Sequence, residues 1–182
     1  DRYALQRDNG DVAYIRFFNA ERPEANLFQV CNQVTINATY TNRYDVTLLV
    51  NGLPLVQIEL KRRGIEMQEA FNQIARYKNH SFSHGHGLFQ FVQLFVISNG
   101  VDTKYFCNNP TPSLSYKYTC YWADEQNRVI TELSAFSEAF LDTAHLSRMI
   151  GHYIVRNETA KQLMVLRPYQ YWASEALIRQ VR

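Results

Sequence analysis

The segment 44–61 constrains the fold of this 182-residue chain more than any other. Two apolar runs, 43–50 and 55–61, flank Asn51-Gly52, a dipeptide typical of a tight turn between antiparallel strands. Three charged residues stand among the apolar ones: Asp45, Glu59 and Lys61. Because a buried charge is costly unless it is paired or bound to a metal, we expect a hairpin that carries a paired or metal-binding group.

Strand geometry decides which of these charges can meet. Glu59 and Lys61 are two residues apart, so their side chains point to the same face of a strand. A plain two-residue turn places Asp45 opposite Ile58, on the wrong face, whereas a three-residue loop or a bulge places it opposite Glu59. A site that uses all three residues therefore predicts an odd loop or a bulge in this hairpin.

The rest of the chain alternates between strand and helix patterns, with a turn expected at Asn42. Further strands are expected at 11–18, 28–40, 89–97 and 104–107. Helices are expected after Gly64 to about Asn79, over 131–155, and after Gln170 to the end of the chain. Strands and helices in this order favour an α/β or α+β sandwich.

Composition narrows the class of protein. Hydrophobic residues make up 46% and charged residues 20% of the chain, as in globular proteins. The net charge of +2 means that a nucleic-acid site must be a local patch. No apolar run is long enough to span a bilayer and no signal peptide is visible, while the missing Met start is typical of a fragment. The odd set of Cys31, Cys107 and Cys120 favours inert thiols in a reducing cytoplasm.

Two carboxylates and a lysine are the residue types of one kind of phosphodiester-cleaving site. Asp45 and Glu59 offer the oxygen ligands that Mg²⁺ prefers. A bound metal polarises a phosphate and lowers the pKa of a water molecule. Lys61 can position that water and offset the charge of the transition state. The competing interpretation is a surface salt bridge among the three residues.

The order of these residues resembles the PD-(D/E)xK nuclease core. Asp45 is followed by Glu59-Leu60-Lys61 and then by a helix, on which Gln73 and Tyr77 match the Gln-x-x-x-Tyr extension of RecB-related nucleases. More specifically, the segments 43–61, 69–77 and 94–100 resemble the nuclease domain of the motor/restriction (R) subunit of type I restriction–modification enzymes. One departure from the pattern is Tyr44, which replaces the usual proline.

The resemblance implies a restriction-endonuclease-like core, with a central mixed sheet flanked by helices, and roles for individual residues. Asp45, Glu59 and the Leu60 backbone carbonyl would hold Mg²⁺, with Lys61 as the catalytic lysine. Gln73 and Tyr77 would contact a DNA phosphate or orient Lys61 and its water. An upstream glutamate is also common in such cores, and Glu21 and Glu24 are candidates by position only. Four basic residues flank this site and could either contact DNA phosphates or be solvated surface charges: Arg62, Arg63, Arg76 and Lys78.

The function implied is a Mg²⁺-dependent endonuclease domain that cuts double-stranded DNA. Its partners would be the specificity and methyltransferase subunits of a type I complex in the cytoplasm of a bacterium or archaeon. ATP would be used only by the motor domains of the full-length subunit. The alternatives are a RecB-like repair or recombination nuclease, and a non-catalytic module that binds DNA or assists assembly.

Residues 167–170, Arg-Pro-Tyr-Gln, resemble the Q motif that precedes the Walker A loop in superfamily 2 helicases. In that family the glutamine, here Gln170, reads the adenine of ATP, but no Walker A sequence follows in this chain. We therefore expect an N-terminally truncated endonuclease domain over 1–155 and a linker into a motor domain over 156–182. An ordinary surface role for Gln170 stays open.

Two other groups of residues favour a structural interpretation. The histidines of a Gly/Ser-rich segment could bind a transition metal, but a polar loop is the simpler explanation: His80, His84 and His86. A group of aromatic residues could stack on bases, but a half-exposed strand explains them equally well: Tyr116, Tyr118, Tyr121 and Trp122.

Overall fold

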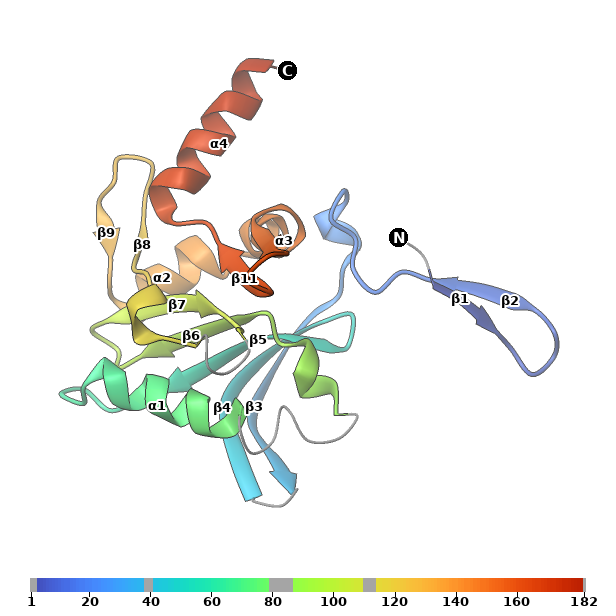
Figure 1. Cartoon of the computed structure of the whole chain (residues 1–182), viewed down its shortest axis with the longest axis horizontal. Helices are drawn as coiled ribbons and strands as arrows, with labels where there is room; N and C mark the ends of the chain where they lie inside the picture. Colours follow the sequence, from blue (N-terminus) through green and yellow to red (C-terminus); the bar gives the residue numbers. More distant parts are fainter. Residues whose placement is uncertain (1–2, 38–40, 79–86, 110–113, 182) are drawn as a thin grey trace.

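The structure is a computed structural model that describes residues 3–37, 41–78, 87–109 and 114–181 (Figure 1). Its strands are β1 (Tyr3–Gln6), β2 (Val12–Ile15), β3 (Phe28–Asn37), β4 (Thr41–Val50), β5 (Leu53–Leu60), β6 (Leu94–Ser98), β7 (Thr103–Cys107), β8 (Trp122–Ala123), β9 (Val129–Ile130), β10 (Ile154–Asn157) and β11 (Gln162–Val165). Its helices are α1 (Met67–Tyr77), α2 (Leu133–Phe140), α3 (Thr143–His152) and α4 (Pro168–Val181), with short 3₁₀ turns η1 (Pro23–Ala25), η3 (Leu88–Phe91) and η4 (Tyr116–Tyr118).

Five strands form the central sheet in the order β3-β4-β5-β6-β7. The β5–β6 pair is parallel and the other pairs are antiparallel. Parallel neighbours need a crossover connection, and α1 provides it. Figure 1 shows α1 against one face of the sheet, with α2 and α3 on the opposite side. The predicted central mixed sheet flanked by helices is therefore confirmed.

Each face of the sheet has its own hydrophobic core. Along β6, Phe95 and Ile97 pack on the α1 side, whereas Leu94 and Val96 pack on the side of α2, α3 and α4. This alternation follows from the two-residue period of a strand. All residues of β6 are buried, as expected for a strand covered on both faces.

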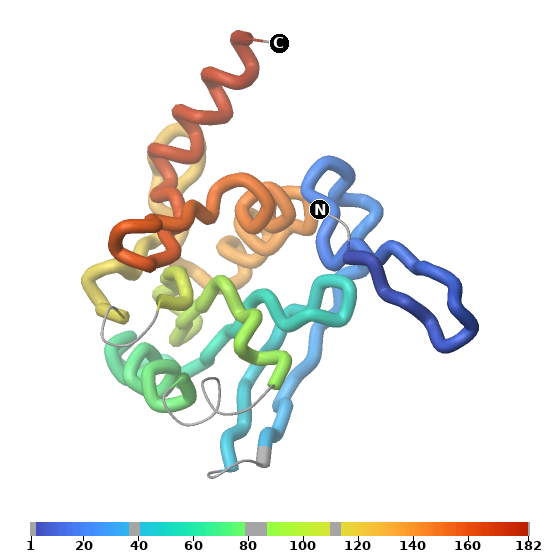
Figure 2. The backbone as a smooth tube through the Cα atoms, turned by 45° about the vertical axis from the view of Figure 1, so that its right-hand side comes forward, coloured from blue at the N-terminus to red at the C-terminus, as the bar shows by residue number. Residues whose placement is uncertain are grey.

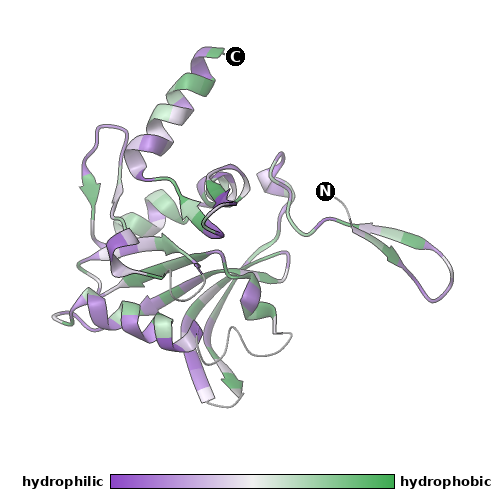
Figure 3. Ribbon diagram, viewed as in Figure 1, coloured by the Kyte–Doolittle hydropathy of each residue, from purple (hydrophilic) through white to green (hydrophobic). Residues whose placement is uncertain are grey.

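Local sequence signals set the hairpin and the first helix. Asn51 and Gly52 have positive φ angles of 51° and 82°, as a type I′ turn requires. The apolar stripe predicted for α1 is buried: Met67, Ala70, Phe71, Ile74 and Tyr77. Figure 3 shows α1 as alternating hydrophilic and hydrophobic bands, which is the expected pattern for a helix with one face on the sheet.

Three predicted boundaries are wrong. Asn42 is not a turn, because β4 begins at Thr41 and its pairing with β3 includes this residue. The apolar run 89–97 holds a strand only from Leu94, preceded by η3, since an apolar run alone does not separate strand from helical turn. The stretch 131–155 is divided between α2, α3 and the start of β10. Asp142 causes the division, because its side chain caps the first turn of α3.

Two elements extend from the body of the molecule, the β1–β2 hairpin and α4 (Figures 1 and 2). α4 begins at Pro168, so Gln170 lies in its first turn and not ahead of a helix. Tyr171 is buried, and the Trp172 indole N–H donates to the Ala123 carbonyl at 2.9 Å. Residues after 155 thus share a core with earlier ones, and the domain boundary at 155 stays a prediction. In the described ranges no helix has the length and apolar character to cross a membrane.

Candidate functional site

A bulge in the β4–β5 hairpin brings Asp45 to the same face as Glu59. The turn has two residues, but the register shifts by one residue within the hairpin. The last pair before the strands separate is Val46 with Ile58, so Asp45 and Glu59 come next on the two strands. The prediction of an odd loop or a bulge is therefore confirmed: the hairpin has a bulge, which shifts the register by one residue.

Glu59 is a buried carboxylate with only part of its hydrogen-bonding capacity used. Its side chain is 1% exposed, and its Oε1 accepts a hydrogen bond from Lys61 Nζ at 2.9 Å. Its Oε2 is buried without a hydrogen-bond partner among the described residues. Burial raises the pKa of Glu59 to about 7, and the nearby Asp45 charge adds to this, while Lys61 opposes it. A cation beside Oε2 would favour the ionised form.

Asp45 lies where β4 has separated from β5. Its Oδ2 accepts a hydrogen bond from the Leu60 backbone N–H at 2.9 Å. A side-chain acceptor thus takes the place of a backbone partner at the end of the ladder. This bond fixes the Asp45 carboxylate beside the Glu59-Leu60 peptide.

A directed chain of hydrogen bonds fixes Lys61. Lys61 Nζ donates to Gln73 Oε1, and Gln73 Nε2 donates to the Tyr77 hydroxyl. That hydroxyl in turn donates to the Arg43 carbonyl at 2.9 Å. Gln73 and Tyr77 are one helical turn apart, so both reach the hairpin from the same side of α1. The structure therefore brings together Lys61, Gln73 and Tyr77, as the sequence predicted.

Two hollows meet on either side of residues 60–62. The first, of about 490 Å³, is lined by Leu60, Lys61, Arg62, Ile65, Glu69, Asn72, Gln73 and Arg76. The second, of about 430 Å³, is lined by Asn32, Gln33, Asp45, Val46, Leu60, Lys61 and Arg62. Sequence reasoning missed Asn32, Gln33 and Asn72. Asn72 carried a usable signal, because Glu69, Asn72 and Arg76 recur at helical spacing opposite the apolar stripe.

The donor set fits a hard divalent cation. Asp45 and Glu59 supply carboxylate oxygens, and the buried Oε2 of Glu59 is available as a ligand. Among the described residues no group of three or more His, Cys, Asp or Glu is gathered. Mg²⁺ is commonly held by one or two carboxylates together with water molecules, so two carboxylates and the Leu60 carbonyl are a sufficient set.

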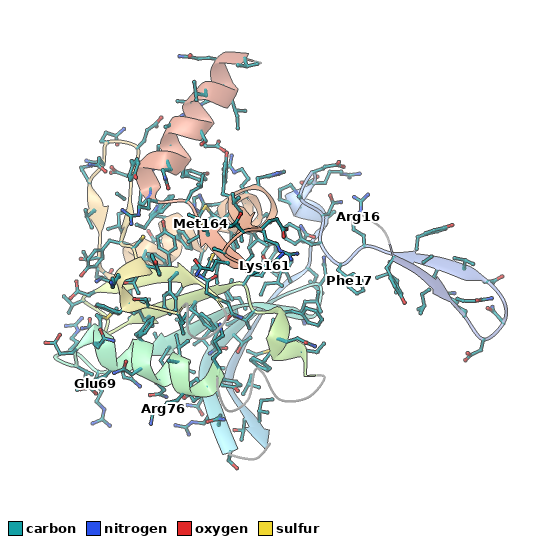
Figure 4. All side chains as sticks on the ribbon, viewed as in Figure 1. Arg16, Phe17, Glu69, Arg76, Lys161 and Met164 are labelled. Carbon is teal, nitrogen blue, oxygen red and sulfur yellow. The ribbon has the colours of Figure 1, made fainter. Side chains whose placement is uncertain are left out.

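Of the four basic residues near the site, two line the hollows and two do not. Arg62 and Arg76 line the hollows, and Figure 4 shows Arg76 on the side of α1 away from the sheet. Arg63 instead lies against Gly100. Lys78 is only 6% exposed, and burial lowers its pKa to about 8, so the expected surface position of Lys78 is wrong. The positions of Arg62 and Arg76 are the ones suited to phosphate contacts.

Several other candidates lie away from this site. Glu21 and Glu24 are exposed; Glu21 precedes η1 and Glu24 lies within it, and η1 packs near α3 on the other face of the sheet. Trp122 is buried in the core of that face and cannot stack on bases, and Tyr116 and Tyr118 belong to η4, not to a strand. His80, His84 and His86 lie outside the described residues.

Gln170 lies in a different cavity. Its Oε1 accepts a hydrogen bond from the Arg167 backbone N–H at 3.0 Å, which holds the start of α4. The cavity, of about 400 Å³, is lined by Cys107, Asn109, Tyr118, Cys120, Asn157, Gln162, Leu163, Met164, Val165, Arg167, Tyr169 and Gln170. The nucleotide-binding role expected for Gln170 stays a prediction.

Comparison with known proteins gives a consistent result. The family model for the N terminus of type I restriction enzyme R proteins matches residues 2–113. The chain is 48% identical over 180 residues to the type I restriction enzyme SauMSSORF170P endonuclease subunit of Staphylococcus aureus (strain MSSA476), covering 99% of this chain and 19% of that protein. It is 42% identical over 176 residues to the type I restriction enzyme EcoprrI endonuclease subunit of Escherichia coli, covering 96% of this chain and 56% of that protein.

The chain thus spans about a fifth of the length of the staphylococcal relative, and it aligns along nearly its whole length. The family match covers both strands of the β4–β5 hairpin, α1 and β6. The chain therefore belongs to the family of type I restriction enzyme R proteins, as a part of their N-terminal region.

Proposed function

We propose that this chain is the DNA-cleaving domain of a type I restriction enzyme R subunit, with a Mg²⁺-dependent site of the PD-(D/E)xK type. One observation carries the proposal. The buried Glu59 carboxylate has one oxygen held by Lys61 and the other without a described partner, beside Asp45 across a bulge. Such a buried carboxylate is costly unless it serves a further ligand. The names of the relatives, which are endonuclease subunits, support the assignment.

Three groups of this chain would hold Mg²⁺: the carboxylates of Asp45 and Glu59 and the Leu60 carbonyl. When bound there, Mg²⁺ would polarise the scissile phosphate and lower the pKa of a water molecule. The Asp45–Leu60 N–H bond and the Lys61–Glu59 bond fix both carboxylates before any ligand arrives. Less reorganisation is then needed when charge develops in the reaction.

Lys61 is the group best placed to act on the reacting phosphate. Its ammonium is held between Glu59 and Gln73, and its side chain is 19% exposed at the junction of the two hollows. From there it can orient the attacking water and stabilise the negative charge of the transition state. Gln73 and Tyr77 support it, because the hydroxyl of Tyr77 is itself held by the Arg43 carbonyl.

Double-stranded DNA would lie over the two hollows. Arg62 and Arg76 line them and are exposed, so they can contact phosphates without reading the sequence. The chain has a net charge of only +2, so this local patch would supply most of the attraction. Target recognition would then reside in a specificity subunit, beside a methyltransferase subunit, in the cytoplasm.

The longer subunit would also use ATP, with motor domains that follow α4 and with Gln170 reading the adenine. Two alternatives remain to be tested against this proposal: a RecB-like repair nuclease and a non-catalytic DNA-binding module. The family match favours the restriction enzyme over the first, and the retained Asp45–Glu59–Lys61 geometry favours catalysis over the second.

The test uses the full-length subunit assembled with its partners. Glu59→Ala and Lys61→Ala should each slow DNA cleavage by about a hundredfold or more, while ATPase activity and translocation continue. Glu138→Ala, which removes an exposed carboxylate from α2, is the matched control and should cut normally. Calorimetry should show loss of Mg²⁺ binding in Glu59→Ala. Normal cleavage by both site variants would show that the assignment is wrong.

A further inference from the structure

Gln33 has a backbone conformation that is rare inside a strand. Its φ angle is 51°, in the left-handed region that residues with a β-carbon disfavour. The other described non-glycine residues with a positive φ lie between paired strands: Asn51, Asn127 and Lys161. Gln33 instead lies in the middle of β3, where an extended backbone is the rule.

This conformation coincides with a gap in the pairing of β3 with β4. Asn32 pairs with Val46, and pairing resumes at the next residue beyond the gap, but Gln33 and Asp45 are not paired. The register is the same on both sides of the gap, so no inserted residue forces it. An extended Gln33 would fit this register, and the break is confined to the residue opposite Asp45.

Asp45 is thus paired with no residue of β3, and it is also paired with no residue of β5. The pairing of β4 with β5 ends at Val46 and Ile58, one residue before Asp45. The separation from both neighbours leaves the second hollow, of about 430 Å³, with Gln33 on its wall. In a regular antiparallel pair the Gln33 side chain would stand beside that of Asp45, with Cβ atoms about 4.5–5.5 Å apart. It would then occupy space beside the Asp45 carboxylate.

We propose that the left-handed break at Gln33 is a positioning device for Asp45. It keeps β3 from closing on the Asp45 carboxylate and leaves the second hollow open to a DNA phosphate. The inference rests on the proposed nuclease function and deepens it. Gln33 acts through its backbone conformation, not through its amide, and is thus a positioning residue. Strained backbone retained next to a reacting group is a recurrent feature of functional sites.

The experiment compares two substitutions at Gln33 in the full-length, assembled enzyme. Gln33→Val disfavours the left-handed conformation, because a β-branched side chain strongly resists it. We expect the strand to straighten, hydrogen exchange of peptides covering 30–36 to slow, and cleavage to fall by about tenfold or more. Gln33→Gly keeps the conformation without strain and removes the side chain. Its cleavage rate should exceed that of Gln33→Val by about tenfold.

Gln29→Val is the matched control, since Gln29 is exposed on the same strand and regularly paired with Leu49. It should change neither exchange near Asp45 nor cleavage. If Gln33→Val does not assemble, Gln33→Asn, which tolerates the left-handed region, and Gln33→Thr, which resists it, replace the pair.

Slower exchange with normal cleavage in Gln33→Val would overturn the proposal, as would an equal loss of cleavage in Gln33→Gly, which would assign the effect to the side chain. Failure of the nuclease function itself is distinguishable, because Glu59→Ala would then still cut.

Discussion

The same five strands form both faces of the central sheet, but the two faces bury different kinds of side chain. On the side of α2, α3 and α4, Trp122 is surrounded by the rings of Phe140, His145 and Tyr171, with centroids 5.2, 4.8 and 5.3 Å away. On the α1 side, the apolar cluster includes described residues of α1, β4, β6 and β7 but none of β5. The difference indicates that one face mainly stabilises the fold, while the other carries the proposed site.

On β5 and the adjoining part of β4, the buried side chains on the α1 side of the sheet are polar. Thr47 Oγ1 donates to Gln57 Oε1 at 2.8 Å, and Glu59 follows on the same face of β5. A buried polar group needs a partner, and Glu59 Oε2 has none in the described part of the chain. The buried Glu59 carboxylate therefore lowers the stability of the protein in the absence of a ligand, as residues of functional sites commonly do.

The largest expected effect comes from the aromatic face. Trp122→Ala should lower the free energy of unfolding by about 3–5 kcal/mol, because it leaves a cavity among rings that cannot close it. Chemical denaturation measures this change. Tyr118→Ala, at a residue 55% exposed, is the control and should change stability little. A loss for Trp122→Ala as small as that of the control would remove the distinction between the two faces.

The next effect has the opposite sign and depends on pH. The pKa of Glu59 rises from 4.5 to about 7 on folding, so the native state binds the proton more tightly than the unfolded state. The resulting destabilisation is absent below pH 4.5, grows between pH 4.5 and 7, and is complete above pH 7. Glu59→Gln should therefore stabilise the metal-free protein by about 1–3 kcal/mol at pH 8.

Melting temperatures in a chelating buffer at pH 5 and pH 8 test this expectation. Added Mg²⁺ should reduce the advantage of Glu59→Gln, because it binds the unmodified site preferentially. A gain in stability that is equal at both pH values would contradict the role of Glu59 ionisation.

Tyr77→Phe should have a smaller effect on stability. It keeps the ring contact with Tyr44, whose centroid is 4.9 Å away, but removes the hydroxyl that joins Gln73 to the Arg43 carbonyl. We expect about 1 kcal/mol of lost stability and about a tenfold slower cleavage from a less constrained Lys61. Tyr116→Phe is the control, because its hydroxyl bonds to Lys104 at 3.2 Å, away from Lys61, and it should leave cleavage unchanged. Equal cleavage rates in the two variants would contradict the role of the Lys61–Gln73–Tyr77 hydrogen-bond chain in cleavage.

The smallest effect concerns the rim of the site. Arg62→Ala should change stability by less than about 0.5 kcal/mol, but it should reduce the salt dependence of DNA binding by about one phosphate contact. Arg63→Ala, one residue further and against Gly100, should leave that dependence unchanged. Binding titrations at several salt concentrations separate the two. An equal effect of both substitutions would show that the hollows do not define the DNA path.

Much of the site could be predicted because it rests on local periodicity. The shared face of Glu59 and Lys61 follows from the two-residue period of a strand, and the shared face of Gln73 and Tyr77 follows from the helical turn. Their action on Lys61 was implied by the family resemblance. The division of the predicted helix at Asp142 and the short β6 were not predicted. A capping residue inside a helical pattern, or an apolar run before a strand, is ambiguous until packing decides it.

The sequence by itself determined the hairpin, the apolar stripe of α1 and the group of residues that could form a site. Only the tertiary structure decided that a bulge places Asp45 beside Glu59, that Arg62 lines the hollows while Arg63 does not, and that β3 breaks at Gln33. The reason is physical. Periodicity fixes the direction of a side chain relative to its own strand or helix, whereas register, bulges and gaps depend on how neighbouring strands pack against one another.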